Sequence, residues 1–212
     1  MPLFTISEVG QAAASATGTM FAEGALGEQA IASRADGYFE AQASEAQRTA
    51  VRHFDIFLSH AYADKVIVTG VYALLKRSGF SVYVDWIHDR HRLNRANVTA
   101  ANAAILRNRM LQCDSLLYAT IHNHTTSKWM PWECGYFDGY DSKAIENPIQ
   151  PGHVAILPVV QSANSSYSGQ EYLGLYPIAQ KANLPRRNLN IHNQHDPTRV
   201  LHFDRWVANG HP

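Results

Sequence analysis

Cysteine is scarce in this sequence. Its 212 residues include two cysteines, Cys113 and Cys134, and they do not form a CxxC pair. A disulfide framework is therefore excluded as the basis of the fold, and a reducing compartment suits the chain better. Long apolar runs are also missing, since no stretch approaches the roughly 20 apolar residues of a membrane span. No basic segment precedes an apolar one at the N-terminus, so we expect no signal peptide and a cytoplasmic protein.

An excess of one charge is lacking as well. The chain has 18 basic and 18 acidic residues, so its formal net charge is zero. Neither nucleic acid nor a membrane is therefore expected as a partner. The charges are unevenly distributed, with two basic and six acidic residues in positions 1–50 against 16 and 12 in the remainder. The mild positive excess of the remainder suits a domain that binds an anionic small molecule.

Several well-known nucleotide and catalytic motifs are absent. The sequence contains no GxGxxG, no Walker A loop and no GxSxG elbow. His122 and His124 form an HxH, and His192 and His195 lie downstream, but no cysteine or carboxylate pattern completes a metal site. We therefore expect neither a metal nor a bound cofactor.

Apolar runs alternate with helical patterns from residue 53 onward. This alternation predicts βαβ units and a parallel sheet of about five strands, with helices on both faces. In such sheets ligands bind beyond the carboxyl ends of the strands. The predicted strands are 54–59, 81–85, 114–121 and 153–160, with a weak one at 189–192; the predicted helices are 64–78, 98–112 (capped by Asn97 or Thr99), 131–140 and 203–208.

Residues 1–50 differ in character from the rest. They are rich in alanine, glycine and serine, and Ile31, Ala35 and Tyr38 form a weak apolar stripe at helical spacing. This segment is interpreted as an N-terminal extension, either loosely ordered or helical and packed on the domain or on a second protomer. Residues 51–212 are then one domain.

Three segments resemble TIR (Toll/interleukin-1 receptor) domains, in the order and spacing of that family. FDIFLSH (residues 54–60) is similar to the opening strand, and SVYVD (81–85) to the second strand, which precedes the variable BB loop. SKWMPWE (127–133) is similar to the S-x-W-x-x-x-E segment at the third helix. The resemblance covers about residues 52–160, and more loosely extends to 207.

The stretch 127–139 is closest to bacterial TIR proteins of anti-phage systems such as Thoeris. This resemblance implies a flavodoxin-like fold and an enzyme that cleaves NAD, its substrate, and makes an ADP-ribose-derived signal, cyclic in some cases, for a separate effector protein. It also implies homo-oligomers held by TIR–TIR contacts, with the BB loop completing the site of a neighbouring protomer. The helix glutamate of the NAD-cleaving members matches Glu133.

The chemistry explains why a carboxylate is needed. Nicotinamide leaves NAD as a neutral group while positive charge builds on the ribose, and a carboxylate stabilises that charge. If Pro131 is the first residue of its helix, Glu133 lies in the first turn, where the helix N-terminus favours an anion. The alternative for Glu133 is a glutamate that only helps the helix to start.

The remaining candidates surround the predicted pocket, and each also has a structural interpretation. For Ser59 with His60, and for Asp85 with Trp86, the structural interpretation is a turn at the end of a strand. For Trp129 and Trp132 it is ordinary packing. Arg90, Arg92 and Arg95 of the loop 86–97 are candidates for pyrophosphate or are simply solvated, and Arg107 and Arg109 are interpreted as an exposed helix face. The predicted substrate-binding residues are Phe57 (by default a core residue), Ser59, His60, Asp85, Trp86, Arg92 and Trp129.

Other functions stay open at this level. One alternative is an enzyme that depletes NAD as a toxin without a signalling product. A TIR scaffold that only binds other TIR domains predicts that Glu133→Ala leaves function intact. A nucleotide sensor without turnover is a third alternative.

Overall fold

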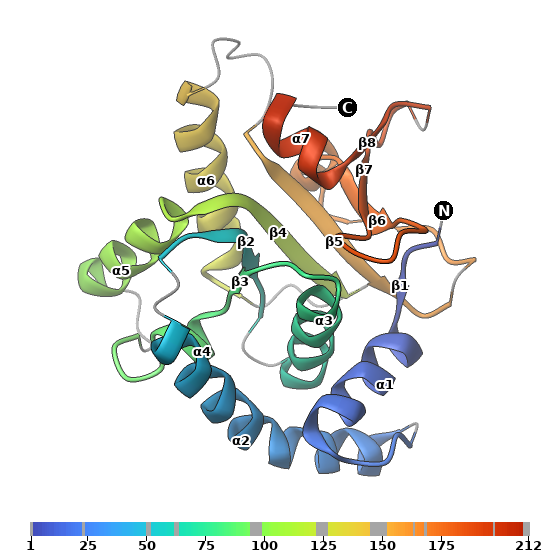
Figure 1. Ribbon diagram of the computed structural model, residues 1–212. Coiled ribbons are helices and arrows are strands. Elements are labelled where there is room, and N and C mark those ends of the chain that lie inside the picture. The colour runs from blue at the N-terminus through green and yellow to red at the C-terminus, as the bar shows by residue number, and fades with distance from the viewer. Residues whose placement is uncertain are drawn as a thin grey trace.

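A computed structural model (Figure 1) gives the arrangement of the chain. It describes residues 2–22, 24–49, 52–61, 64–93, 99–121, 127–144, 152–162, 164–167, 169–196 and 198–209. Several residues that the sequence pointed to lie outside this part of the chain, namely Arg95, Asn97, His122 and His124.

The centre of the fold is a mostly parallel sheet. Its strands, in the described residues, are β1 (Phe4–Thr5), β2 (Phe54–Ser59), β3 (Val82–Tyr83), β4 (Cys113–Ile121), β5 (Val154–Val160), β6 (Ile178–Lys181), β7 (Leu189–His192) and β8 (Val200–His202). They run in the order β3-β2-β4-β5-β6-β7-β8, and β1 pairs with β5. The first five strands of this order pair in parallel, which is the flavodoxin-like order. The predicted fold class is confirmed.

The sheet has more strands than the five expected. β7 and β8 extend it in antiparallel fashion beyond β6. In the described residues, the connections β6–β7 and β7–β8 are short and hold no helix. Parallel neighbours need a longer crossover, so connections of this kind join antiparallel strands. β3 is shorter than predicted because the chain turns into a helix at Asp85.

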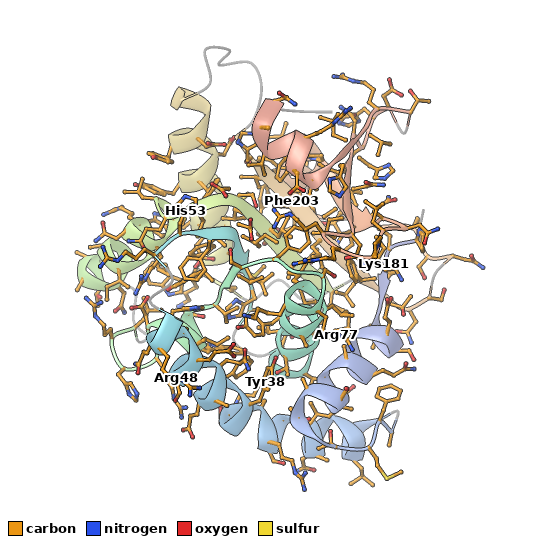
Figure 2. All side chains as sticks on the ribbon, in the orientation of Figure 1. Tyr38, Arg48, His53, Arg77, Lys181 and Phe203 are labelled. Atoms are coloured by element: carbon orange, nitrogen blue, oxygen red, sulfur yellow. The ribbon has the colours of Figure 1, made fainter. Side chains whose placement is uncertain are left out.

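Helices cover both faces of this sheet, as Figure 1 shows. They are α1 (Ile6–Thr17), α2 (Ala25–Thr49), α3 (Lys65–Arg77), α4 (Asp85–His88), α5 (Ala100–Met110), α6 (Met130–Ala144) and α7 (Phe203–Asn209), with a 3₁₀ turn at Glu171–Leu175. Side chains of α2, α3 and α7 form one core with one face of the sheet, and those of α5, α6 and the 3₁₀ turn form a second core with the other. Figure 2 shows these side chains filling the space between the elements.

Local sequence signals account for two of the helix boundaries. Thr99 caps α5, because its side chain accepts a hydrogen bond from the backbone N–H of Asn102 at 3.2 Å. Gly79 follows the end of α3 with φ of 90°, a conformation that costs glycine little. Thr99 is one of the two caps expected from the sequence, and Gly79 lies directly after the expected end of the helix at residue 78.

The N-terminal helices lie against the sheet's own helices. Val9 and Phe39 are buried in the same core as Val71 and Leu58. Lys181 of β6, labelled in Figure 2, donates a hydrogen bond of 2.6 Å to Glu8 of α1. Residues 6–49, where described, therefore form a helical layer on α3 and on one edge of the sheet (Figure 1).

Gly70 sets how closely α1 and α3 approach. A Cβ atom at this position would overlap the backbone carbonyl of Val9. We expect Gly70→Ala to lower the free energy of unfolding by about 1–3 kcal/mol, because a backbone group cannot move aside without shifting a helix. A urea denaturation midpoint measures this.

Gly37 on α2 provides the matched control. Apart from the adjoining residues and the nearby backbone of α2 itself, no heavy atom of the described residues lies within 4 Å of a Cβ built there. Gly37→Ala is expected to leave stability unchanged or raise it by about 0.5–1 kcal/mol through helix propensity. Equal denaturation midpoints for the two alanine variants would contradict the close α1–α3 contact.

Candidate active site

Ser59 and Glu133 meet at the carboxyl edge of the sheet. Ser59 is the last residue of β2, and Glu133 lies in the first turn of α6. The Ser59 hydroxyl donates a hydrogen bond of 2.7 Å to Glu133 Oε2. Both residues are 0% exposed. β2 is flanked by β3 on one side and β4 on the other, so this pair lies at the point where the strand order reverses, the expected place for a ligand in such a fold.

The start of α6 fixes Glu133. The Ser127 hydroxyl accepts hydrogen bonds from the backbone N–H groups of Trp129 and Met130, at 3.3 and 3.2 Å. The helix begins at Met130, so Pro131 is its second residue rather than the first, a correction of one position. Either position suits proline, because the first-turn N–H groups have no partner within the helix. Glu133 stays in the first turn of the helix, as expected.

Trp129 lies just before α6, as expected if the helix does not include it. It is buried, with 5% of its surface exposed, and its ring packs edge-to-face on Trp132 at 5.5 Å between centroids. Trp132 is half-buried and faces α5, where the Arg107 guanidinium lies 5.5 Å from its ring centre. Packing is therefore the observed role of both tryptophans.

His60, Asp85 and Trp86 form a second cluster next to Ser59. The Nε2 atom of His60 lies 3.3 Å from Asp85 Oδ1, and both side chains are almost fully buried. The other ring nitrogen lies 2.8 Å from the carbonyl oxygen of Leu58, which can only accept a hydrogen bond. The Trp86 ring packs edge-to-face on His60, with centroids 4.6 Å apart. The structure thus brings three of the predicted residues together beside the Ser59–Glu133 pair.

Two other predicted substrate-binding residues make contacts that involve neither Ser59 nor the His60 cluster. Phe57 has no exposed surface and stacks on Tyr83 within the core at 5.0 Å, which is the default interpretation made from the sequence. Arg92 has a largely exposed side chain whose Nη1 lies 3.6 Å from Asp89 Oδ1. Arg90, also in this loop, pairs with Glu40 of α2 at 2.7 Å.

Asp89 anchors the start of the BB loop, and sequence reasoning missed it. It is 2% exposed and accepts hydrogen bonds from Arg109 Nε at 2.6 Å, from Arg109 Nη2 at 3.1 Å and from the Tyr83 hydroxyl at 3.0 Å. These bonds raise the pKa of Arg109. The interpretation of Arg109 as part of an exposed helix face is therefore wrong, because the chain uses this cation to neutralise a buried carboxylate. Nothing in the local pattern singles out Asp89, since its partners come from distant segments.

His88, at the end of α4, makes this region sensitive to pH. It lies between the rings of Phe54 and Tyr83, and burial lowers its pKa from 6.5 to about 4. The unfolded chain binds a proton near pH 6.5, whereas the folded chain does so only near pH 4. Stability is therefore expected to fall as the pH drops from about 6.5 to about 4.

Urea denaturation at several pH values measures this dependence. In His88→Asn, the loss of stability between pH 6.5 and 4 should be smaller than in the wild type, because the titrating group is gone. The asparagine amide replaces the ring nitrogen, which lies 2.9 Å from the Val84 carbonyl oxygen. Identical pH slopes in the two proteins would contradict the role given to burial.

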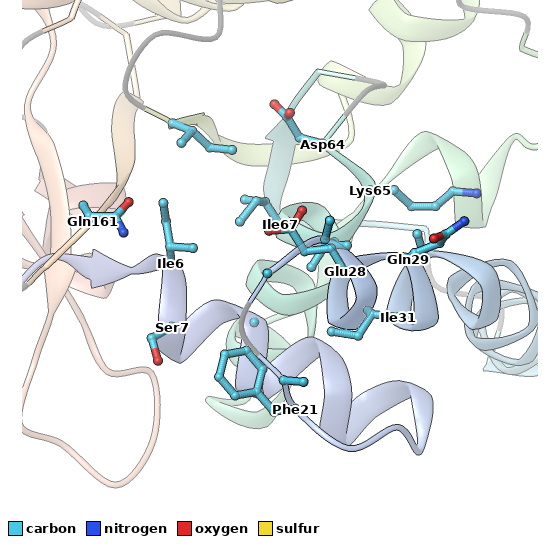
Figure 3. A pocket seen from close by; sticks show the side chains of 17 residues that line it. Ile6, Ser7, Phe21, Glu28, Gln29, Ile31, Asp64, Lys65, Ile67 and Gln161 are labelled. Atoms are coloured by element: carbon cyan, nitrogen blue, oxygen red, sulfur yellow. The ribbon is translucent and has the colours of Figure 1, made fainter.

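A cavity of about 880 Å³ opens near the carboxyl ends of β4 and β5 (Figure 3). It lies among α1, α2 and the start of α3, and neither Ser59 nor Glu133 lines it. Its charged lining residues are Glu28, Asp64 and Lys65, and Lys65 is bonded to Asp36. Two carboxylates and one paired cation do not favour a pyrophosphate, so this cavity is not assigned to NAD.

Among the described residues, no helix combines the length and the apolar character that crossing a membrane requires. The same part of the chain holds no group of three or more histidine, cysteine, aspartate or glutamate side chains placed for a metal ion.

Comparisons with known proteins place the chain among its relatives. No family model matches it. It is 42% identical over 158 residues to "Probable 3' cyclic ADP-D-ribose synthase ThsB'" of Bacillus cereus (strain MSX-D12), a match that spans 73% of this chain and 75% of the relative. It is also 26% identical over 83 residues to "Putative cyclic ADP-D-ribose synthase TIR2" of Cytobacillus dafuensis, covering 39% of this chain and 22% of that protein. The resemblance found in the sequence is therefore confirmed, and the chain belongs to the Thoeris-like TIR proteins of anti-phage defence.

Proposed function

We propose that this protein breaks the nicotinamide–ribose bond of NAD and converts the remainder into a cyclic ADP-ribose signal. The observation that carries the proposal is the buried Ser59–Glu133 pair at the switch point of the sheet, in a chain 42% identical to a protein named as a 3' cyclic ADP-D-ribose synthase. No metal or bound cofactor is needed for this reaction, because nicotinamide leaves as a neutral group.

Glu133 is the proposed catalytic residue. As the bond to nicotinamide breaks, the electron pair leaves with the ring nitrogen and positive charge develops on the ribose. A carboxylate in the first turn of α6 stabilises that charge. The Ser59 hydroxyl, bonded to Oε2, orients the carboxylate. The cation is then captured either by water, which gives ADP-ribose, or by a hydroxyl of the same molecule, which gives a cyclic product; in both cases the attacking oxygen releases one proton.

His60, Asp85 and Trp86 are proposed to form the wall of the substrate pocket. Their cluster lies at the ends of β2 and β3, directly after Ser59. Trp129, just before α6, is proposed to border the same pocket and Arg92 to meet the pyrophosphate, whereas Phe57 is proposed to support the pocket from the core. We propose that the protein works in the cytoplasm, a location that suits its two unpaired cysteines.

Assembly is proposed to control access to this site. Ser59 and Glu133 have no exposed surface, so NAD reaches the carboxylate only after neighbouring groups move. Contacts between protomers through the BB loop are the proposed cause of that movement, and the product is proposed to act on a separate effector protein. This arrangement implies a weakly active monomer. A toxin that depletes NAD constitutively would not have one, so the two functions can be distinguished.

Nicotinamide release followed against protein concentration tests the proposal. The rate per protomer is expected to rise with concentration, or with a crowding agent that promotes assembly, because the closed protomer turns over slowly. Oligomers that form without any nicotinamide release would instead support the scaffold alternative.

A further inference from the structure

The N-terminal helix α2 contacts both loops beside the proposed site. Asp36 accepts two hydrogen bonds of 2.9 Å from Lys65, the first residue of α3, which follows the β2–α3 loop. Glu40 accepts one of 2.7 Å from Arg90, which follows α4. Asp36 and Glu40 are four residues apart and therefore lie on one face of the helix. One face of α2 thus bridges the chain segments that follow β2 and β3.

Phe39 lies on the same helix and reaches further inward. It is 2% exposed, and its ring packs edge-to-face on Trp86 with centroids 5.4 Å apart. Trp86 in turn packs edge-to-face on His60 at 4.6 Å. His60 is the neighbour of Ser59, which bonds to Glu133. A line of packed rings therefore runs from α2 to His60, the residue that directly follows Ser59 in the chain.

The contacts of α2 are not equal in strength. The carboxylates of Asp36 and Glu40 are 58% and 64% exposed, and exposed ion pairs contribute little. The Phe39–Trp86 contact is buried, and an edge-to-face geometry between aromatic rings is specific as well as attractive. Phe39 is therefore the residue through which α2 holds the site.

We propose that Phe39 is a positioning residue for the reaction, which fixes Trp86 and through it the ring of His60. This inference rests on the NAD cleavage proposed above. It makes the N-terminal segment a part of the active-site architecture rather than an appendage. Phe39 itself touches no substrate, so its effect falls on the orientation of the pocket wall.

Ile31 offers a matched control on the same helix. It is 1% exposed, like Phe39, but it packs on Ala13 and Ala14 of α1 and not on the site. Phe39→Ala and Ile31→Ala both remove a buried anchor of α2, so both are expected to lower the unfolding temperature. Only Phe39→Ala is expected to lower kcat for nicotinamide release, on the order of 10- to 100-fold, because a small misplacement of a pocket wall has effects of that size.

A conservative variant separates positioning from folding. Phe39→Leu keeps an apolar side chain of similar size against Trp86, and it should recover much of kcat in the full-length protein. If Phe39→Ala does not fold, kcat of Phe39→Leu is compared with kcat of Ile31→Ala instead. Phe39→Leu is expected to have the lower kcat of the two, because leucine lacks the aromatic edge. Equal losses of kcat in the Phe39 and Ile31 variants would overturn the proposal.

Hydrogen exchange gives a readout that does not depend on NAD. The amides of Ile87, His88 and Asp89 donate to Val84 and Asp85 carbonyls within and around α4. They should exchange faster in the Phe39 variants than in wild type or Ile31→Ala, and unchanged exchange would count against the contact. A wild-type protein that leaves NAD intact would refute the proposed function, whereas normal cleavage by Phe39→Ala would refute only this inference.

Discussion

Removal of residues 1–50 is expected to leave a chain that does not fold stably. The deletion takes away large buried apolar side chains, among them Phe4, Val9, Ile31 and Phe39, and uncovers the α3 surface beneath them. Burial of one such side chain stabilises a protein by about 1.5–3 kcal/mol. Four of them together are comparable with the whole free energy of unfolding of a typical domain, about 5–15 kcal/mol.

Circular dichroism and size-exclusion chromatography measure the outcome. The truncated chain should aggregate, or lack a cooperative thermal transition. Leu26→Ser in the full chain is the control, because Leu26 is also on α2 but is 85% exposed, and its replacement should change nothing. A truncated chain that unfolds cooperatively at the wild-type temperature would show that residues 1–50 are dispensable for the fold.

Glu133→Gln is expected to lower the rate of nicotinamide release by about 100- to 1000-fold. The amide keeps the size of the side chain and its ability to accept a hydrogen bond from Ser59, but it loses the negative charge that stabilises the developing cation. Removal of a single electrostatic stabiliser of a transition state has an effect of this size. The rate is measured with saturating NAD in the full-length protein.

Two controls accompany this variant. Glu28→Gln removes a carboxylate that lines the separate cavity, and it should retain the wild-type rate. Ser59→Ala removes the hydrogen bond of 2.7 Å but leaves the charge, so its loss should be smaller than that of Glu133→Gln. A Glu133→Gln protein with near-normal turnover would exclude the carboxylate from the chemistry.

The sequence predicts the central fold well because its signals there are local. A run such as FDIFLS is buried on both sides and forms β2 with the bounds expected. Thr99 caps α5 through its own side chain and is one of the two caps expected, and Gly79 ends α3 through its backbone conformation, directly after the expected end of that helix. β7 forms at the bounds predicted for the weak strand 189–192. β1, β6 and β8 are not predicted, because such short strands have no clear pattern and their pairing depends on neighbours that no local signal identifies.

The residues of the candidate site also fall into those that the sequence could predict and those that it could not. Residues at strand ends, such as Ser59 and Asp85, could be placed at one edge of the sheet from topology alone. The Asp89–Arg109 pair and the Phe39–Trp86 contact could not, because each joins segments whose proximity appears only in the folded chain. Arg109 illustrates the difference, since a cation on a helix is usually solvated and this one is bonded to a buried carboxylate.

The most direct test is a mass spectrum of NAD after incubation with the assembled wild-type protein. The proposed function predicts free nicotinamide together with a product lighter than ADP-ribose by one water molecule, as a cyclic isomer requires. Formation of ADP-ribose alone would retain the cleavage and refute the cyclisation. Intact NAD at every protein concentration would contradict the central claim that this TIR protein is an enzyme.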